Sequence, residues 1–286
     1  MVEALPSVSK EIRPLTTHDM PSAAALSRDV NWPHRLEDWQ WVLSLGHGLA
    51  VCSQGRLQGT AMWWRYGRQM ARIGMVIVDP AAQRAGIGRH LMLELLQQFD
   101  EPTVLLNATS QGETLYRQLG FQPVGTIVQH QGTYFTGPLV LPRTGERVRP
   151  VGRNDLDCLI ALDAEAFGIG REAVIKALME TGEAVALDRG GETAGFAFFR
   201  RFGRGYTIGP VVAPDPEGAK VLIAHWVGSN VGMFIRIDVP ATAGLCAWLD
   251  ELGLVRASQV TSMVRGPVLP CGTTVSVFAV VNQALG

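Results

Sequence analysis

An apolar run at residues 76–78 leads into a loop that contains Gly86 and Gly88 and then opens onto an amphipathic stretch. The N-terminus of a helix presents unpaired backbone N–H groups and the positive end of its dipole, which favours a pyrophosphate. The two glycines let the backbone approach oxygen atoms closely, and Arg84 and Arg89 would help to neutralise phosphate charge. This segment therefore predicts a phosphate-binding loop.

Two glycines at this spacing are, by themselves, also typical of a plain turn. The third glycine of the dinucleotide-binding fingerprint is absent, and no Gly-Lys-Ser/Thr of a phosphate-binding P-loop is present. The loop therefore needs a second feature before it indicates a particular ligand.

That second feature is Tyr116, which lies 28 residues after Gly88 and begins the sequence Tyr-x-x-x-Gly-Phe. With Gln83-x-x-Gly86-x-Gly88, it resembles the acetyl-CoA-binding core of the GCN5-related N-acetyltransferases, the GNAT superfamily. The resemblance is specific over residues 72–121 and looser over the rest of the first half.

The resemblance implies acetyl-CoA as co-substrate and assigns a role to each matching residue. The backbone of Val76, Ile77 and Val78 would face the pantetheine arm and the thioester carbonyl. The pyrophosphate would be bound by Gln83, Arg84, Ala85, Gly86, Ile87, Gly88 and Arg89. Thr109 stands where the family often has an asparagine that contacts the pantetheine arm, and its hydroxyl can still donate a hydrogen bond.

The resemblance also implies that Tyr116 is the catalytic general acid. Acyl transfer to an amine releases a thiolate, which must be protonated as it leaves. A phenol of pKa ~10 can donate to a thiolate whose conjugate acid has a pKa of ~8.5. The competing interpretation is a core tyrosine whose ring packs on Phe121.

The general base is harder to assign. Many family members carry an acidic residue on the strand before the loop, but the only charged residue of that strand here, at 71–78, is Arg72. Glu37, Asp38 and His34 are candidates, although charged residues on the surface of a helix explain each of them as well. Asn107 could orient a water molecule or pair with backbone.

The second half of the chain repeats the first. Matches follow one another in order at an offset of 136 that falls to 133, and two α/β domains sharing turn residues by chance rarely produce such a series. The clearest pairs are residues 12–15 with 148–151, 65–67 with 201–203, and 119–121 with 252–254. We predict a catalytic GNAT domain at 1–140 and a degenerate GNAT-like domain at 147–286.

The second copy has lost the residues that carry the chemistry. Its loop keeps one glycine, Gly218, gains Asp215 and Glu217, and contains prolines that remove two backbone donors. Leu249 replaces the tyrosine and cannot donate a proton. We therefore predict a single working site in the first half, although Gly218 and Lys220 leave open a site for a smaller anion.

Each half reads as helices followed by strands and then by alternating strands and helices. The expected fold class is α/β (α+β mixed), with two tandem GNAT-like domains, each a mostly antiparallel twisted mixed sheet with flanking helices. A parallel strand pair should flank the helix at 88–99. Residues 126–130 and 133–135 should close the first half as a hairpin.

The composition restricts the class of partner. Lys and Arg number 25 against 26 Asp and Glu, so a broad affinity for nucleic acid or anionic membrane has no support. No apolar run is long enough to span a bilayer, the first twenty residues lack an apolar leader, and Cys and His lack ligand spacing. We expect a cytoplasmic protein without a metal, either a monomer with an internal pseudo-dimer or a homodimer.

The sequence thus favours an acyltransferase that moves an acetyl group from acetyl-CoA to an amine of a small molecule or peptide by direct transfer in a ternary complex. One alternative is a non-catalytic acyl-CoA-binding or sensor module. A second is a nucleotide-binding α/β protein, which the incomplete glycine pattern disfavours.

Overall fold

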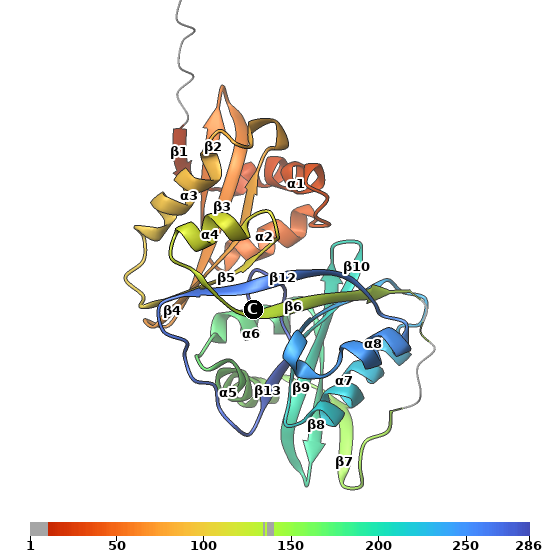
Figure 1. Cartoon of the computed structure of the whole chain (residues 1–286). Helices are drawn as coiled ribbons and strands as arrows, with labels where there is room; N and C mark the ends of the chain where they lie inside the picture. The colour runs from red at the N-terminus through yellow and green to blue at the C-terminus, as the bar shows by residue number, and fades with distance from the viewer. Residues whose placement is uncertain (1–10, 134, 136–139) are drawn as a thin grey trace, which may run out of the picture. The chain divides into compact units, whose positions relative to one another are not determined.

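The structure, a computed structural model, describes residues 11–133, 135 and 140–286. The prediction that an apolar leader is absent concerns the first twenty residues, and residues 1–10 lie outside the described part of the chain. The chain forms two compact units (Figure 1). The first unit comprises the chain up to Trp64 with Ile73–Asp100, and the second comprises Arg65–Arg72 with Glu101–Gly286.

The first unit is an antiparallel sheet with three helices. The strands are β1 (Glu11–Pro14), β2 (His47–Ser53), β3 (Arg56–Tyr66) and β4 (Met70–Val78), and the helices are α1 (Met20–Asp29), α2 (Leu36–Ser44) and α3 (Ile87–Leu96). Strand β2 pairs with β1 and β3. The turn between β2 and β3 has positive φ at Gln54 and Gly55, as a tight hairpin requires. Helix α3 confirms the helix predicted at 88–99, although it ends three residues earlier.

Close packing in the first unit depends on a glycine in β3. A Cβ on Gly59 would approach the Ile77 carbonyl oxygen and the Ile87 side chain to 3.1 Å. Helix α3 buries Leu91 and Leu95. The glycine therefore lets α3 lie directly on the sheet, which fixes the loop that precedes the helix.

The second unit contains the remaining elements. Its strands are β5 (Thr103–Ala108), β6 (Gln122–Gly132), β7 (Glu146–Pro150), β8 (Glu183–Arg189), β9 (Glu192–Phe202), β10 (Gly205–Ala213), β11 (Ile235–Pro240), β12 (Val255–Arg265) and β13 (Ser276–Ala279). Its helices are α4 (Glu113–Gln118), α5 (Leu156–Phe167), α6 (Glu172–Thr181), α7 (Pro216–Ser229) and α8 (Cys246–Leu252). Strands β10 and β11 are parallel on either side of the α7 crossover.

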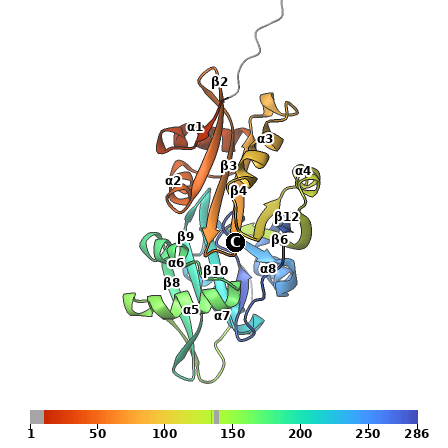
Figure 2. The same cartoon turned by 90° about the vertical axis from the view of Figure 1, so that its left-hand side faces the viewer.

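The strand order in the second unit is β5-β12-β6-β11-β10-β9-β8-β7. Strand β12 comes from the second half of the sequence and pairs with β5 and β6, which come from the first. Strand β6 pairs on its other side with β11. The two halves have therefore exchanged their last strands. Figure 1 and Figure 2 show β6 beside β12.

The predicted hairpin that closes the first half is wrong. Strand β6 is continuous from Gln122 to Gly132, and its partners are β11 and β12. Thr133 and Phe135 lie outside any strand, while Tyr134 lies outside the described residues. Partners from the second half supply the hydrogen bonds that a local return strand was expected to supply.

The order of elements confirms the internal repeat. The first repeat (β1 to β6) and the second repeat (β7 to β12) each contain a strand, two helices, three strands, a helix, a strand, a helix and a strand. Both repeats shift register in the equivalent hairpin, after Val51 and after Leu187. The predicted domains at 1–140 and 147–286 stay a prediction. Their bounds follow the two sequence repeats, whereas the two compact units are defined by contacts in space and have other bounds.

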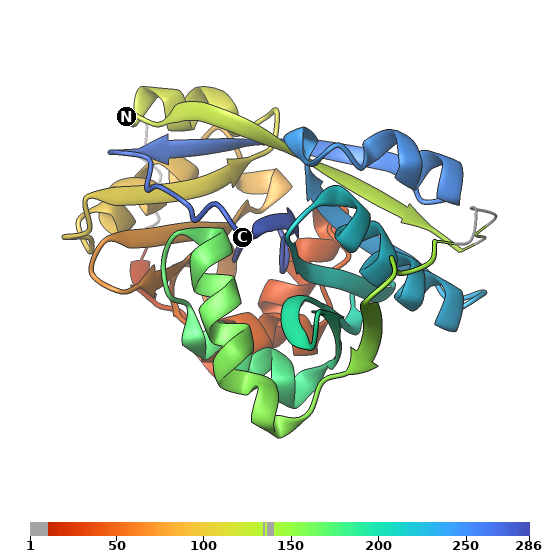
Figure 3. The ribbon, with the colours of Figure 1, turned by 90° about the horizontal axis from the view of Figure 1, so that it is seen from below.

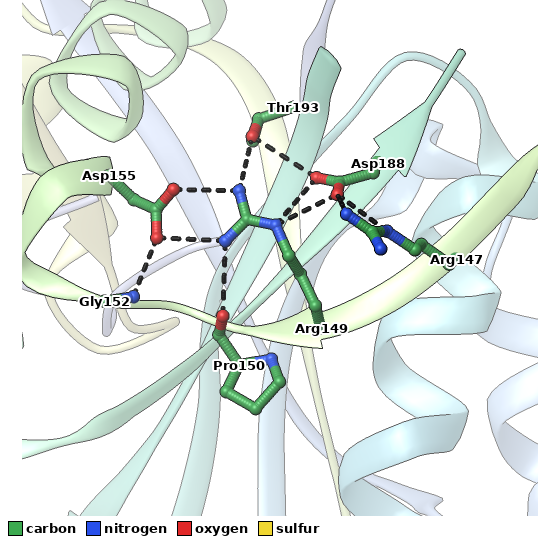
Figure 4. Close-up of polar contacts among 7 residues, drawn as sticks. All are labelled: Arg147, Arg149, Pro150, Gly152, Asp155, Asp188 and Thr193. Carbon is green, nitrogen blue, oxygen red and sulfur yellow. Dashed lines mark hydrogen bonds and ion pairs between the residues drawn. The ribbon is translucent and has the colours of Figure 1, made fainter. Parts of the chain in front are cut away.

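The same ion pair stabilises the start of each repeat. In the first, Arg13 donates to both Asp19 carboxylate oxygens at 2.7 and 2.8 Å. In the second, Arg149 donates to both oxygens of Asp155 at 2.8 and 2.9 Å (Figure 4). These four residues lie at the predicted offset of 136. Arg149 also contacts Asp188 at 3.0 Å, where the first repeat has the Cys52 sulfur, 3.3 Å from Arg13.

The last residues of the chain belong to the second unit and lie beside α5 (Figure 3). The Tyr66 hydroxyl donates to the Leu285 carbonyl oxygen at 2.9 Å, and Arg72 Nε donates to that of Ala284 at 3.2 Å. The buried Arg171–Asp163 pair, at 2.8 Å, also faces this segment. No helix in the described part of the chain is long and apolar enough to span a membrane.

Candidate functional site

The strand that leads to the glycine loop contains a local distortion. Met75 has a φ of 51°, and its carbonyl oxygen accepts a hydrogen bond of 2.8 Å from the buried Thr60 hydroxyl. A left-handed residue inside a strand interrupts the regular ladder, and such irregularities concentrate next to functional sites. Sequence reasoning missed this feature, because methionine carries no signal for positive φ.

The loop is held at its start and open at its end. The Asp79 carboxylate accepts from the Ala81 N–H at 2.9 Å, and the Gln83 side chain donates to the Val78 carbonyl oxygen at 3.3 Å. Arg84 and Gly86 both have positive φ, 63° and 78°. Gly86 is the N-cap of α3, without a side-chain cap and without an acidic residue in the first turn.

The N-terminal amides of α3 are therefore open to an external anion. The first hydrogen bond of the helix runs from the His90 N–H to the Gly86 carbonyl oxygen, so the amides of residues 87–89 have no partner within the helix. The Gly86 Cβ position has open space around it. The geometry thus has the features of an anion-binding helix start.

The predicted donor-site residues of this segment lie together in the first unit. Val76 and Val78 are half-buried and Ile77 is buried on β4. In the loop and first turn, Gln83, Arg84, Ala85, Gly86 and Arg89 are exposed, Gly88 is half-buried, and Ile87 is buried. In the first turn Ile87 therefore packs into the core, while Arg84 and Arg89 stay at the surface.

The other predicted segment, β5 and α4, belongs to the second unit. The Thr109 carbonyl oxygen accepts from the N–H groups of Gly112 and Glu113 at 3.0 and 3.1 Å, which starts the α4 turn. The Tyr116 ring lies on Phe121 with centroids 6.1 Å apart in an edge-on arrangement. A Cβ on Gly112 would come within 2.9 Å of the Tyr116 ring, so the glycine makes room for it.

Tyr116 is a packed ring with an unpartnered hydroxyl. The residue is 8% exposed, yet its hydroxyl forms no hydrogen bond with any residue that the structure describes. Burial raises the pKa of Tyr116 above its usual value of about 10. The hydroxyl is not among the fully buried side-chain atoms that lack a partner, so it lies at the small exposed part of the residue, where a ligand could reach it. The core interpretation thus accounts for the ring and leaves the hydroxyl unexplained.

The residues considered as general bases have structural roles or lie on the surface. The buried Asp38 carboxylate accepts from the Arg35 backbone N–H and guanidinium at 2.9 and 2.8 Å, which caps α2. Glu37 is exposed on that helix, and the His34 ring lies 5.7 Å from that of Trp32. The geometry within the first unit assigns no base.

Asn107 is occupied on both sides of its amide. Its oxygen accepts from the Ser262 hydroxyl at 2.7 Å, and its nitrogen donates to the Gln283 carbonyl oxygen at 2.7 Å. Of the two alternatives, pairing with backbone is the one observed, but the backbone is distant in sequence rather than local. Each end of the Asn107 amide is thus held by a protein partner, which explains its position without a role in orienting a water.

The equivalent loop of the second repeat is closed by its own side chains. The Asp215 carboxylate caps α7 by accepting from the Gly218 N–H at 2.8 Å. The same carboxylate pairs with Arg189 at 2.8 Å and with Arg143 at 3.0 Å. Lys220 lies 3.6 Å from Glu217. The alternative of a smaller anion at Gly218 and Lys220 is disfavoured, because an internal carboxylate already binds the amide of Gly218.

Leu249 takes the place of Tyr116 in the second repeat. The Phe121 N–H donates to the Tyr116 carbonyl oxygen at 3.0 Å, and the Leu254 N–H donates to that of Leu249 at 2.9 Å. Leu249 is fully buried in the apolar core of the second unit. The predicted alignment at offset 133 is therefore confirmed at the level of backbone hydrogen bonds.

These features define a class: an α/β protein built from two copies of one strand–loop–helix fold, with one loop open to anions. Protein-family models for the acetyltransferase (GNAT) domain match residues 42–137 and 159–277. The chain belongs to the GNAT superfamily, as a tandem protein with two GNAT domains.

Similar proteins agree with this assignment. The uncharacterized N-acetyltransferase YitH of Bacillus subtilis (strain 168) is 28% identical over 77% of this chain and 78% of its own length. The fold is similar to that of a protein from Pyrococcus horikoshii assigned as an acetyltransferase, with a TM-score of 0.80, 22% identity, and coverage of 100% and 99% of the two chains. A tandem GNAT protein from the clavulanic acid biosynthesis pathway gives 0.64 at 15% identity, over 91% and 100%.

Proposed function

We propose that this protein is an N-acetyltransferase that moves an acetyl group from acetyl-CoA to an amine of a small molecule or peptide. The transfer is direct, in a ternary complex, and the cysteines need not form an acyl-enzyme, since all four lie outside the recognised motifs. The observation that carries the proposal is Tyr116, whose ring is buried while its hydroxyl has no partner among the described residues.

Acetyl-CoA would be bound through the first repeat. The open amides at the start of α3 and the exposed side chains of Arg84 and Arg89 suit the pyrophosphate. The half-buried Thr109 has a hydroxyl without a hydrogen bond to any described residue, so it is free to donate to the pantetheine arm. Backbone groups of residues 76–78 would polarise the thioester carbonyl.

Tyr116 would act as the general acid. A neutral amine attacks the thioester carbon, the carbonyl oxygen becomes an oxyanion, and collapse expels the CoA thiolate. The phenol donates its proton to that sulfur as the carbon–sulfur bond breaks. The attacking nitrogen releases one proton to solvent water as the amide forms, and the Tyr116 phenolate takes up a proton from solvent, which completes the cycle. Because burial raises the pKa of Tyr116, the phenol keeps its proton across the physiological pH range.

The second repeat would not bind acetyl-CoA. Asp215 occupies the α7 start as a capping carboxylate, and Leu249 has no proton to donate. The proposed enzyme therefore binds one acetyl-CoA per chain.

Two measurements test the proposal. Calorimetric titration of the protein with acetyl-CoA should give one site per chain, and an amine library screened by release of free thiol should identify an acceptor. Absence of a calorimetric signal at millimolar acetyl-CoA would contradict the donor assignment. Binding without turnover on any aminoglycoside, amino acid, polyamine or peptide would instead favour an acyl-CoA sensor.

A further inference from the structure

Strand β12 of the degenerate repeat presents two consecutive hydroxyl side chains to the β5–α4 segment of the first repeat. In the β5 register, Thr261 lies opposite Ala108 and Ser262 lies opposite Asn107. Consecutive side chains of a strand point to opposite faces of a sheet. The two hydroxyls therefore reach two different features, one on each face, at the point where the chain leaves β5 for α4.

Thr261 contacts the helix that carries Tyr116. Its hydroxyl donates to Glu113 Oε2 at 3.1 Å, while Glu113 Oε1 accepts from Arg117 at 2.6 Å. Both oxygens of this carboxylate are thus engaged, and these bonds lower the pKa of Glu113. Glu113 lies three residues before Tyr116, so the two side chains are neighbours on one helix face.

Ser262 secures the strand from which that helix departs. Its hydroxyl donates to Asn107, whose amide nitrogen donates in turn to the Gln283 carbonyl oxygen. The Gln283 side chain donates to Asp238 at 3.1 Å, and Asp238 forms a buried pair with Arg236 at 2.8 Å. This chain of bonds holds the end of β5 against β12 and β11, independently of Thr261.

Helix α4 spans six residues, Glu113–Gln118, and its Tyr116 hydroxyl has no internal hydrogen bond within the described residues. So short a helix has little stability of its own and depends on tertiary contacts. The position of the phenol thus depends on packing of its ring and on the contacts that fix the helix. The Thr261–Glu113 bond is one of these contacts, and it reaches α4 from the other repeat.

We propose that Thr261, in the half of the chain without a working site, is a positioning residue that fixes the Tyr116 helix through Glu113. The proposal rests on the proposed role of Tyr116 as the acid. It gives the degenerate repeat a part in catalysis: its exchanged strand orients the proton donor of the first repeat.

The test compares hydroxyl and shape at position 261. Thr261→Val keeps the branched shape and removes the donor, whereas Thr261→Ser keeps the donor. Loss of alignment should lower kcat for acetyl transfer about tenfold in the valine variant. The serine variant should stay within about twofold of the parent. The KM for acetyl-CoA and the melting temperature should not change in either.

A matched control is Ser258→Ala on the same strand, whose exposed hydroxyl lies 3.4 Å from Gln129 and away from α4. It should leave kcat unchanged. Glu113→Ala removes the acceptor of the same hydrogen bond. If the Glu113→Ala protein is folded, its kcat should fall as far as that of Thr261→Val. Equal kcat values for the valine and serine variants, or a valine variant slower only because it melts earlier, would overturn the proposal.

A double substitution separates this inference from the proposed function. In a Tyr116→Phe background, Thr261→Val should cause no further loss of kcat, since residues that act through one step are not additive. An additional tenfold loss would show that Thr261 acts elsewhere. If Tyr116→Phe alone keeps full turnover, acetyl transfer stands, but the acid assignment fails, and with it the positioning role of Thr261.

Discussion

The starts of helices α3 and α7 occupy equivalent places in the two repeats but differ in how their amides are satisfied. The α3 start has Gly86 as N-cap, without a side-chain cap, and exposed arginines nearby. The α7 start has Asp215, whose carboxylate binds the Gly218 amide and two arginines. One start is open to an anion, and the other contains an anion of its own.

This difference agrees with the prediction of a single working site in the first repeat. A carboxylate satisfies the same helix amides and cations that a phosphate would satisfy, and it does so permanently because it belongs to the chain. The backbone at the two starts differs as well, since Gly86 is left-handed with a φ of 78° and Asp215 is extended with a φ of −156°. The α4 and α8 turns show the same relation, since Leu249 keeps the backbone hydrogen bond of Tyr116 and loses the phenol.

The largest expected effect concerns the phenol that distinguishes the repeats. Tyr116→Phe should lower kcat by about 10²- to 10⁴-fold, the usual contribution of a general acid, with little change in acetyl-CoA affinity. Turnover would be followed by thiol release and affinity by calorimetry. Tyr206→Phe is the control, since the Tyr206 ring stacks on Phe199 in the second repeat, 4.8 Å between centroids. Unchanged kcat in Tyr116→Phe would contradict the assignment.

The next largest effect concerns acetyl-CoA affinity when the first loop is given a carboxylate like that of Asp215 in the second loop. Gly86→Asp puts a carboxylate at the α3 start, which should repel phosphates and weaken acetyl-CoA binding about 10- to 30-fold. The space around this position accommodates a side chain. Gly86→Asn has nearly the same shape and tolerance of positive φ as Gly86→Asp but lacks the charge, and it serves as control. Equal losses in the two variants would mean that backbone strain, not charge, is responsible.

The reverse comparison concerns stability. Asp215→Ala should lower the free energy of unfolding by about 1–2 kcal/mol, because a helix cap and two ion pairs are lost. Burial opposes ionisation of Asp215, but the Gly218 amide and Arg189 outweigh it and lower its pKa. The difference between parent and variant should therefore be full above about pH 4 and shrink as the pH falls through the lowered pKa.

Denaturant titrations at pH 7 and pH 3 would measure this difference. The control is Glu217→Gln, a change at an exposed residue of the same turn that should shift stability by less than about 0.5 kcal/mol. A constant difference between the two pH values would contradict the proposed linkage.

The smallest effect compares the ion pairs that begin the two repeats. Arg13 lowers the pKa of Asp19 to about 2, so this pair stabilises the fold above about pH 4 and is lost as the pH falls toward 2. Allowing for solvent screening, Asp19→Asn should cost about 1–2 kcal/mol. Asp155→Asn should cost less, because Arg149 keeps Asp188 as a partner. Equal losses in thermal melts at neutral pH would show that Asp188 does not compensate.

Local sequence patterns determined the repeat and most elements. The Arg13–Asp19 and Arg149–Asp155 pairs lie at the predicted offset because each partner is six residues from the other, and such short-range relations survive duplication together. The open glycine loop was also recognisable, since its amides belong to consecutive residues. The positions of Tyr116 and Leu249 followed from the turn that succeeds each of them.

The tertiary structure alone decided which strands pair across the repeats and what holds Asn107 and Glu113. The sequence pattern predicts a strand at 126–130, but it does not name the partners of that strand, because pairing register depends on residues far apart in the sequence. The predicted hairpin failed for this reason. The Ser262–Asn107 and Thr261–Glu113 contacts span about 150 residues, and they exist because the repeats exchange their last strands.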